Sequence, residues 1–118
     1  MFYGLLQLNR LKNLEVLDAS HREMNDGAIE GFENCRSLKR LNISGGKVSS
    51  AGLKLLTKLK ELEELDVGNS PGINDAGLPA LRGHRQLKKL NLNGTRCTPA
   101  GVEALKKVLK DTEIGFAG

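Results

Sequence analysis

Leu38-Lys39-Arg40-Leu41-Asn42-Ile43 is one of four copies of a short motif that decides the fold of this chain. The other copies are Leu14-Glu15-Val16-Leu17-Asp18-Ala19, Leu62-Glu63-Glu64-Leu65-Asp66-Val67 and Leu87-Lys88-Lys89-Leu90-Asn91-Leu92. The copies begin at residues 14, 38, 62 and 87, so the steps between them are 24, 24 and 25 residues. Self-similarity at a fixed period of this length indicates a repeat architecture.

A second block follows each motif in the same register and predicts a helix. Its copies are Asn25-Asp26-Gly27-Ala28-Ile29, Ser49-Ser50-Ala51-Gly52-Leu53, Asn74-Asp75-Ala76-Gly77-Leu78 and Thr98-Pro99-Ala100-Gly101-Val102. Apolar or small positions recur three and six residues later, at Phe32 and Cys35, Leu56 and Leu59, Leu81 and His84, Leu105 and Val108. This spacing is typical of one face of a helix. The predicted N-caps are Asn25 or Asp26, Ser49 or Ser50, Asn74 or Asp75, and Thr98, and Pro99 suits a first helical position.

The first motif predicts a short strand, because its last two apolar residues alternate with period two. The polar residue between them, which is Asp18, Asn42, Asp66 or Asn91, must then point toward solvent. A strand and a helix of this size cannot bury their apolar faces alone, so successive copies stack on one another. We therefore expect a solenoid whose interior holds the equivalent leucines side by side, namely Leu17, Leu41, Leu65 and Leu90.

The composition indicates a globular protein with an aliphatic core. Hydrophobic residues make up 39% and charged residues 27% of the 118 positions, while aromatic residues are only 3%. No apolar run approaches the roughly 18 residues of a membrane-spanning helix, and the segment Met1 to Leu8 has no export signal. Cys35 and Cys97 lie in different repeats, too far apart to bridge, so we expect free thiols. These features predict an intracellular, cytoplasmic protein that does not enter membranes.

These repeats resemble the leucine-rich-repeat superfamily, and in particular the ribonuclease-inhibitor-like subgroup found in F-box proteins, with units of the form L-x-x-L-x-L-S-G-T-x-I-T-D-A-G-L. The resemblance implies an α/β fold, a right-handed horseshoe segment with a parallel β-sheet on its concave face and helices on its convex face. It also implies protein ligands bound mostly on the strand surface. The position that is often Asn or Cys in the broader family is Arg22, Gly46, Ser70 and Thr95 here, so the usual asparagine ladder is absent.

We expect a single domain over residues 1–118. It divides into a partial N-terminal repeat over 1–13, repeats over about 14–37, 38–61, 62–86 and 87–110, and a terminal cap strand over 111–118. The opening Met1-Phe2-Tyr3 predicts an uncapped solenoid end with exposed apolar surface. Such an end continues into a longer repeat protein, docks against a partner or a second copy, or is covered by the first helix itself.

The outward strand positions form two rows in which the sign of charge alternates. One row is Val16, Arg40, Glu64, Lys89 and Glu113, and the next is Glu15, Lys39, Glu63 and Lys88. Opposite charges on adjacent strands hold the strand register, or the same mosaic steers a partner. The leading hypothesis is a protein-interaction scaffold, with partner-binding residues Arg40, Asn42, Glu64, Asp66, Lys89 and Asn91 on the concave face.

Two alternatives to this scaffold rest on other features of the chain. Between residues 82 and 110 the basic residues Arg82, Arg85, Lys88, Lys89, Arg96, Lys106, Lys107 and Lys110 face a single acid, Glu103. They suggest a ribonucleoprotein subunit that contacts RNA, although no aromatic residues interleave them for base stacking. The F-box likeness suggests, as a minor alternative, the substrate-recognition part of a ubiquitin-ligase adaptor.

An enzyme, a cofactor site and a metal site are not expected from this sequence. His84 takes a helix position that carries Cys35, Leu59 and Val108 in other repeats, which favours a core role. His21 lies in the turn after the first strand, and neither histidine has ligands at metal-binding spacing. The recurrent glycines mark helix starts and turns rather than a phosphate loop.

Overall fold

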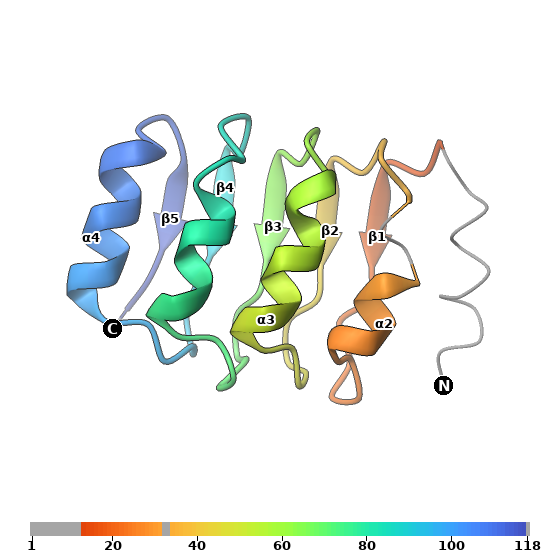
Figure 1. Ribbon diagram of the computed structural model, residues 1–118, viewed down its shortest axis with the longest axis horizontal. Helices are drawn as coiled ribbons and strands as arrows, with labels where there is room; N and C mark the ends of the chain where they lie inside the picture. The colour runs from red at the N-terminus through yellow and green to blue at the C-terminus, as the bar shows by residue number, and fades with distance from the viewer. Residues whose placement is uncertain (1–12, 32–33, 118) are drawn as a thin grey trace.

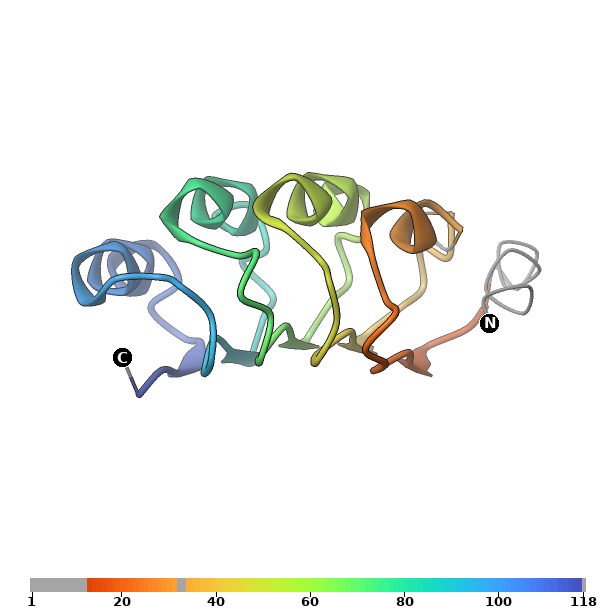
Figure 2. The same ribbon diagram turned by 90° about the horizontal axis from the view of Figure 1, so that it is seen from below.

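The computed structural model describes residues 13–31 and 34–117, which form a coil of two layers (Figure 1). Five parallel strands make one sheet in chain order: β1 (Val16–Asp18), β2 (Arg40–Asn42), β3 (Glu64–Asp66), β4 (Lys89–Asn91) and β5 (Glu113–Gly115). Helical segments connect them: α2 (Asp26–Glu30), α3 (Ser50–Leu53) with the 3₁₀ helix η1 (Lys54–Lys58), the 3₁₀ helix η2 (Asp75–Leu81) and α4 (Pro99–Val108). Figure 2 shows the helices on the outside of a shallow arc and the strands inside it. The predicted α/β solenoid is confirmed.

The strand register is the one that the 24-residue period predicts. Leu17 pairs with Leu41, Leu41 with Leu65, and Leu65 with Leu90 across successive parallel strands. Leu41, Leu65 and Leu90 are buried, and Leu17 at the edge of the sheet is partly buried against the same core. Ile114 continues the row on β5. The expected column of equivalent leucines is therefore confirmed.

Aliphatic side chains from both layers fill the space between sheet and helices. Each full repeat contributes equivalent residues, so the core is a set of parallel columns: Leu38, Leu62 and Leu87; Ile43, Val67 and Leu92; Met24, Val48, Ile73 and Cys97; Ile29, Leu53, Leu78 and Val102. Since every column gains one member per repeat, each repeat buries its apolar face only against its neighbours. The face of the sheet that points away from the helices is left free of this packing.

The helices differ from repeat to repeat, and two of them are wholly or partly 3₁₀ rather than α. In the second repeat the buried residues Leu53, Leu56 and Leu59 are each three apart, and three residues per turn aligns them on a 3₁₀ helix. In the third repeat Pro79 lies inside η2, where it lacks the amide that an α-helical turn needs. In α4 the buried positions Leu105 and Leu109 are four apart, as the α period requires.

The predicted N-caps are confirmed at Asn25, Ser49, Asn74 and Thr98, whose side chains accept first-turn amides. The residue after each of the first three caps forms hydrogen bonds with the next repeat. Both carboxylate oxygens of Asp26 accept hydrogen bonds from Ser49, its backbone amide at 2.9 Å and its hydroxyl at 2.6 Å. Asp75 accepts the same pair from Thr98. Ser50 and Asn74 are joined likewise, so a ladder at the helix starts links the repeats where an asparagine ladder is absent.

None of the helices in the part of the chain that the structure describes has the length and apolar character to cross a bilayer. The predicted open end with Met1, Phe2 and Tyr3 lies outside the described residues.

Candidate functional site

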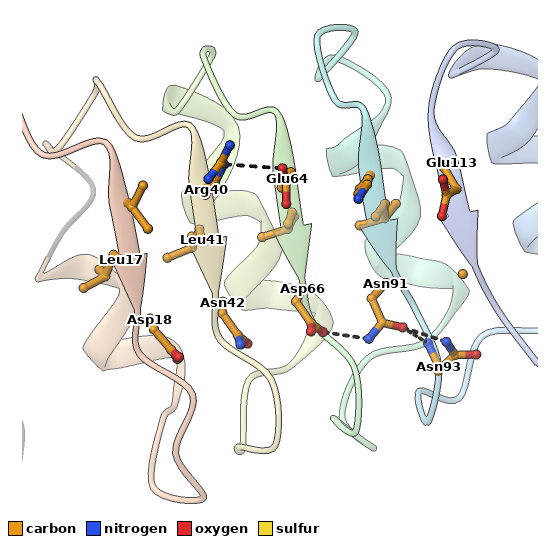
Figure 3. Close-up of a pocket in the computed structure, with 15 residues that line it drawn as sticks. Leu17, Asp18, Arg40, Leu41, Asn42, Glu64, Asp66, Asn91, Asn93 and Glu113 are labelled. Carbon is orange, nitrogen blue, oxygen red and sulfur yellow. Dashed lines mark hydrogen bonds and ion pairs between the residues drawn. The ribbon is translucent and has the colours of Figure 1, made fainter.

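A groove of about 450 Å³ runs across the inner, concave face of the sheet (Figure 3). Its lining comes from all five strands and from Asn93, which follows β4. The six partner-binding candidates lie together in this groove: Arg40, Asn42, Glu64, Asp66, Lys89 and Asn91. Alternation along each short strand accounts for this, because the residues on either side of a buried leucine both face outward.

The charged row across the middle of the strands forms ion pairs only in part. Arg40 Nε lies 3.3 Å from Glu64 Oε2, which joins β2 to β3. Lys89 has no acidic group within 4.0 Å among the described residues, although Glu64 and Glu113 are its neighbours in register. Exposed pairs of this kind contribute between zero and about 1 kcal/mol. In this row the Arg40–Glu64 pair helps to hold the strand register, whereas Lys89 leaves an unpaired charge in the groove.

The next row, nearer the start of the strands, also pairs incompletely. Lys39 Nζ lies 3.9 Å from Glu15 Oε1, and Lys88 Nζ lies 3.4 Å from Glu63 Oε1. Lys39 and Glu63, which the alternation of signs also predicts as partners, are not within ion-pair distance. The alternating ladder predicted from the sequence is thus formed at three of its steps.

The row at the ends of the strands has a second role that sequence reasoning missed. Oδ1 of Asp18, Asn42, Asp66 and Asn91 accepts the backbone amide two residues further on, which belongs to Ser20, Ser44, Gly68 and Asn93, at 2.9 to 3.0 Å. Asp and Asn side chains form such turns readily. Figure 3 shows the four side chains aligned. The signal was present, since an Asp or Asn stands at the same place in every copy of the motif.

Hydrogen bonds beyond these turns fix the same row more firmly. The hydroxyl of Ser20 donates to Asp18 Oδ1 at 2.7 Å, and Asn91 Nδ2 on β4 donates to Asp66 Oδ1 on the adjacent strand β3 at 2.9 Å. The Ser20 hydroxyl and the Ser20 amide lower the pKa of Asp18 below its ordinary value. Its carboxylate is therefore ionised at neutral pH.

The cysteines are not arranged as nucleophiles. Cys35 and Cys97 are buried and are not joined to each other in a disulfide. Burial raises the pKa of both thiols, so they stay protonated near neutral pH. Among residues 13–31 and 34–117, no three His, Cys, Asp or Glu side chains come together in a way that could hold a metal ion.

His84 packs in the core as its repeat position predicts. It is 2% exposed, and its Nε2 lies 3.0 Å from the carbonyl oxygen of Leu56 in the preceding repeat. Its Nδ1 is buried with no hydrogen-bond partner among the described residues. Burial is the largest cause that lowers the pKa of His84 below 6.5, so the ring is neutral in the folded protein and donates from Nε2.

Acid is expected to destabilise the fold through this histidine. Below about pH 6.5 the unfolded chain binds a proton at residue 84 that the folded chain resists, so the free energy of unfolding falls as pH falls. His84→Leu, which copies Leu59 of the preceding repeat, should reduce this fall between pH 7 and pH 5. The substitution also removes the buried Nδ1, and a buried nitrogen without a hydrogen bond destabilises a folded protein by about 1 to 3 kcal/mol. Urea unfolding at both pH values measures the effect, and an equal loss in both proteins would contradict it.

The basic residues of the C-terminal half do not share one layer of the molecule. Lys89 lies on β4 and lines the concave groove, whereas Lys106 and Lys107 lie in the last turn of α4, in the helical layer. Figure 2 shows these two layers on opposite sides of the coil. The positive charge that suggested RNA is thus divided between the two layers.

Comparisons with known proteins agree with this architecture. The family model described as "Leucine Rich repeat" matches residues 34–56. A leucine-rich-repeat protein of Leptospira interrogans has a similar structure (TM-score 0.70, 21% identity), with 94% of this chain and 27% of that one covered. Actin-binding site 2 of leiomodin-1 is similar too (TM-score 0.77, 13% identity; 100% and 80% covered). So is a plant peptide hormone receptor, RGFR1, in complex with RGF2 (TM-score 0.59, 17% identity; 94% and 18% covered). This chain thus spans about a quarter of the length of the Leptospira protein.

Proposed function

We propose that this chain, a solenoid similar in fold to leucine-rich-repeat proteins, is a protein-interaction module that binds a partner in the groove on the concave face of its sheet. The observation that carries this proposal is the lining of the groove, where Arg40, Glu64 and Lys89 alternate with Asn42, Asp66 and Asn91 over three central strands. Among the described residues, none that line the groove belongs to a helical segment. A partner therefore meets charged groups, amides and the strand surface together.

The chemistry of the groove suits a protein segment better than a small molecule. It is open, and it crosses all five strands rather than closing around one point. Val16 on β1 is 56% exposed and is the one large hydrophobic residue exposed in the described chain, so the groove offers an apolar contact at one end. Polar groups around an apolar contact are typical of protein interfaces. Two proteins of similar fold have protein or peptide partners: the plant receptor is in complex with RGF2, and the leiomodin-1 site binds actin.

The repeat subgroup and the intracellular location that the sequence predicts are also part of this proposal. We place the chain with the ribonuclease-inhibitor-like repeats because helix starts such as Asn74-Asp75-Ala76-Gly77-Leu78 follow that pattern. We also place it inside the cell, because its two buried cysteines form no disulfide with each other, as is usual for thiols kept reduced there. An RNA-binding role is not proposed, since the basic residues divide between two layers.

A bulky side chain in the middle of the groove tests the proposal without presupposing the charge of the partner. Lys89 is exposed and has no ion pair with the described residues, so Lys89→Trp fills the groove without breaking an ion pair, and tryptophan is well tolerated in strands. A partner captured from cell extract and identified by mass spectrometry should bind the variant at least about 10-fold more weakly by calorimetry, as expected when a central interface position is blocked.

The matched control is Lys107→Trp, the same substitution at an exposed position of α4 on the opposite layer. It should leave both the partner affinity and the thermal unfolding midpoint unchanged. If Lys89→Trp binds as tightly as the parent protein, or if Lys107→Trp alone loses the partner, the concave groove is not the binding site.

A further inference from the structure

The groove differs from the rest of the chain in the sign of its charge. Its lining holds four carboxylates, Asp18, Glu64, Asp66 and Glu113, and two cations, Arg40 and Lys89, so its formal charge is 2 − 4 = −2. The whole chain carries +4. The concave face is thus the acidic part of a basic protein. Resting on the function proposed above, we propose that the groove takes a basic segment of its partner, with lysine or arginine side chains over the row of strand ends.

The ion pair inside the groove leaves the net charge at −2 and places this charge on the groups that remain unpaired. Arg40 is already neutralised by Glu64 at 3.3 Å. Neither Asp18 nor Asp66 has a cationic group of the described chain within 4.0 Å. After the internal pair is removed, three carboxylates, Asp18, Asp66 and Glu113, face Lys89 alone. An acidic partner segment would meet repulsion at most of these positions, and a basic one meets attraction.

Asp18 and Asp66 are held in place with one oxygen free. Oδ1 of Asp18 accepts both donors of Ser20, and Oδ1 of Asp66 accepts the Gly68 amide and the Asn91 side chain. Oδ2 of each makes no hydrogen bond with the described residues. Because the aspartates are oriented before binding, little side-chain entropy is lost when a lysine or arginine donates to them.

The spacing of these carboxylates matches a peptide with repeated cations. Asp18 is on β1 and Asp66 is on β3, and two strand separations amount to about 10 Å. Asn42 lies between them on β2, also with its Oδ1 engaged by the turn. Figure 3 shows the three side chains in line. A segment that crosses the strands can therefore place one cationic group on each aspartate, with a neutral residue facing Asn42.

Two short probe peptides of opposite charge test the sign of the groove. One is an octapeptide of alternating lysine and serine, and the other alternates glutamate and serine. In ¹⁵N NMR titrations of the full chain, the lysine peptide should shift the amide signals of Ser20, Ser44 and Gly68, the residues whose amides bond to the row of strand ends. The glutamate peptide should leave them in place. Shifts with the glutamate peptide instead, or none with the lysine peptide, would overturn the inference.

The double variant Asp18→Asn with Asp66→Asn removes the charge and keeps an oxygen for each turn. Its dissociation constant for the lysine peptide should rise by about 5- to 10-fold, in keeping with the loss of two exposed ion pairs. The matched control is Glu103→Gln with Asp111→Asn, which removes two exposed charges outside the groove. Equal weakening in both variants would overturn the inference, because the attraction would then be a property of the whole chain.

The natural partner separates this inference from the proposed function. A partner that is lost with Lys89→Trp and binds the aspartate double variant more weakly supports both. One that is lost with Lys89→Trp but binds the double variant unchanged leaves the concave groove as the binding site and overturns its preference for a basic segment.

Discussion

Replacing Leu65 by alanine is expected to lower the free energy of unfolding by about 2 to 5 kcal/mol. Leu65 is 2% exposed and lies on β3, the central strand, between Leu41 and Leu90. The substitution therefore opens a cavity that borders two neighbouring repeats. Small domains are stable by only about 5 to 15 kcal/mol, so this single change removes a large part of the total. Urea unfolding followed by far-ultraviolet circular dichroism measures it.

Leu55→Ala is the matched control for this loss. Leu55 lies in η1 and is only partly buried against the core, so truncating it leaves a smaller cavity. The same chemical change should therefore cost less than half as much. A similar loss in both variants would contradict the prediction, because it would show that Leu65 contributes no more to stability than a partly buried leucine of the helical layer.

The periodic part of the fold could be predicted because a repeat is specified by local sequence. The 24-residue spacing of Leu17, Leu41 and Leu65 fixed which residues pair across strands, and the structure confirms the register. Short oxygen-bearing residues before each apolar run were enough to locate the caps at Ser49 and Thr98. Stacking of identical units converts these local signals directly into a tertiary arrangement.

The helix type was harder to predict, since α and 3₁₀ helices share their starting signals. Apolar residues at intervals of three, as in Leu53, Leu56 and Leu59, fit one face of either helix over a short stretch. The choice between an α helix and a 3₁₀ helix depends on which additional residues are buried. In the last repeat, for example, Leu109 is buried four residues after Leu105. Burial depends on the neighbouring repeat, which periodicity within one repeat does not contain.

In the groove, the sequence predicted which side chains face outward but not what they bond to. The strand-end residues Asn42, Asp66 and Asn91 point into the groove, yet each also closes a turn through its Oδ1. The pattern of charges predicted that Lys89 meets Glu64, but they form no ion pair. Long exposed side chains gain little from such contacts, so their pairing follows local conformational preferences that charge patterning does not record.

Gly46→Ala is expected to be the second severe change, with a loss of about 3 kcal/mol in the free energy of unfolding. Gly46 is buried in the turn after β2. A Cβ placed there would lie 2.6 Å from the carbonyl oxygen of Met24 and 2.7 Å from that of His21, both backbone atoms of the preceding repeat. The Met24 carbonyl accepts the Lys47 amide, so moving it aside would break a hydrogen bond that joins the two repeats.

Gly83→Ala separates this close approach from any general effect of glycine. Gly83 is exposed, its backbone is not left-handed, and a Cβ there would have no heavy atom within 4 Å. Alanine at such a position restricts the unfolded chain, so Gly83→Ala should leave stability unchanged or raise it by up to about 1 kcal/mol. Thermal unfolding of both variants measures the difference. If Gly46→Ala unfolds at the same temperature as the parent protein, the backbone of Met24 does not lie as close to Gly46 as the structure places it.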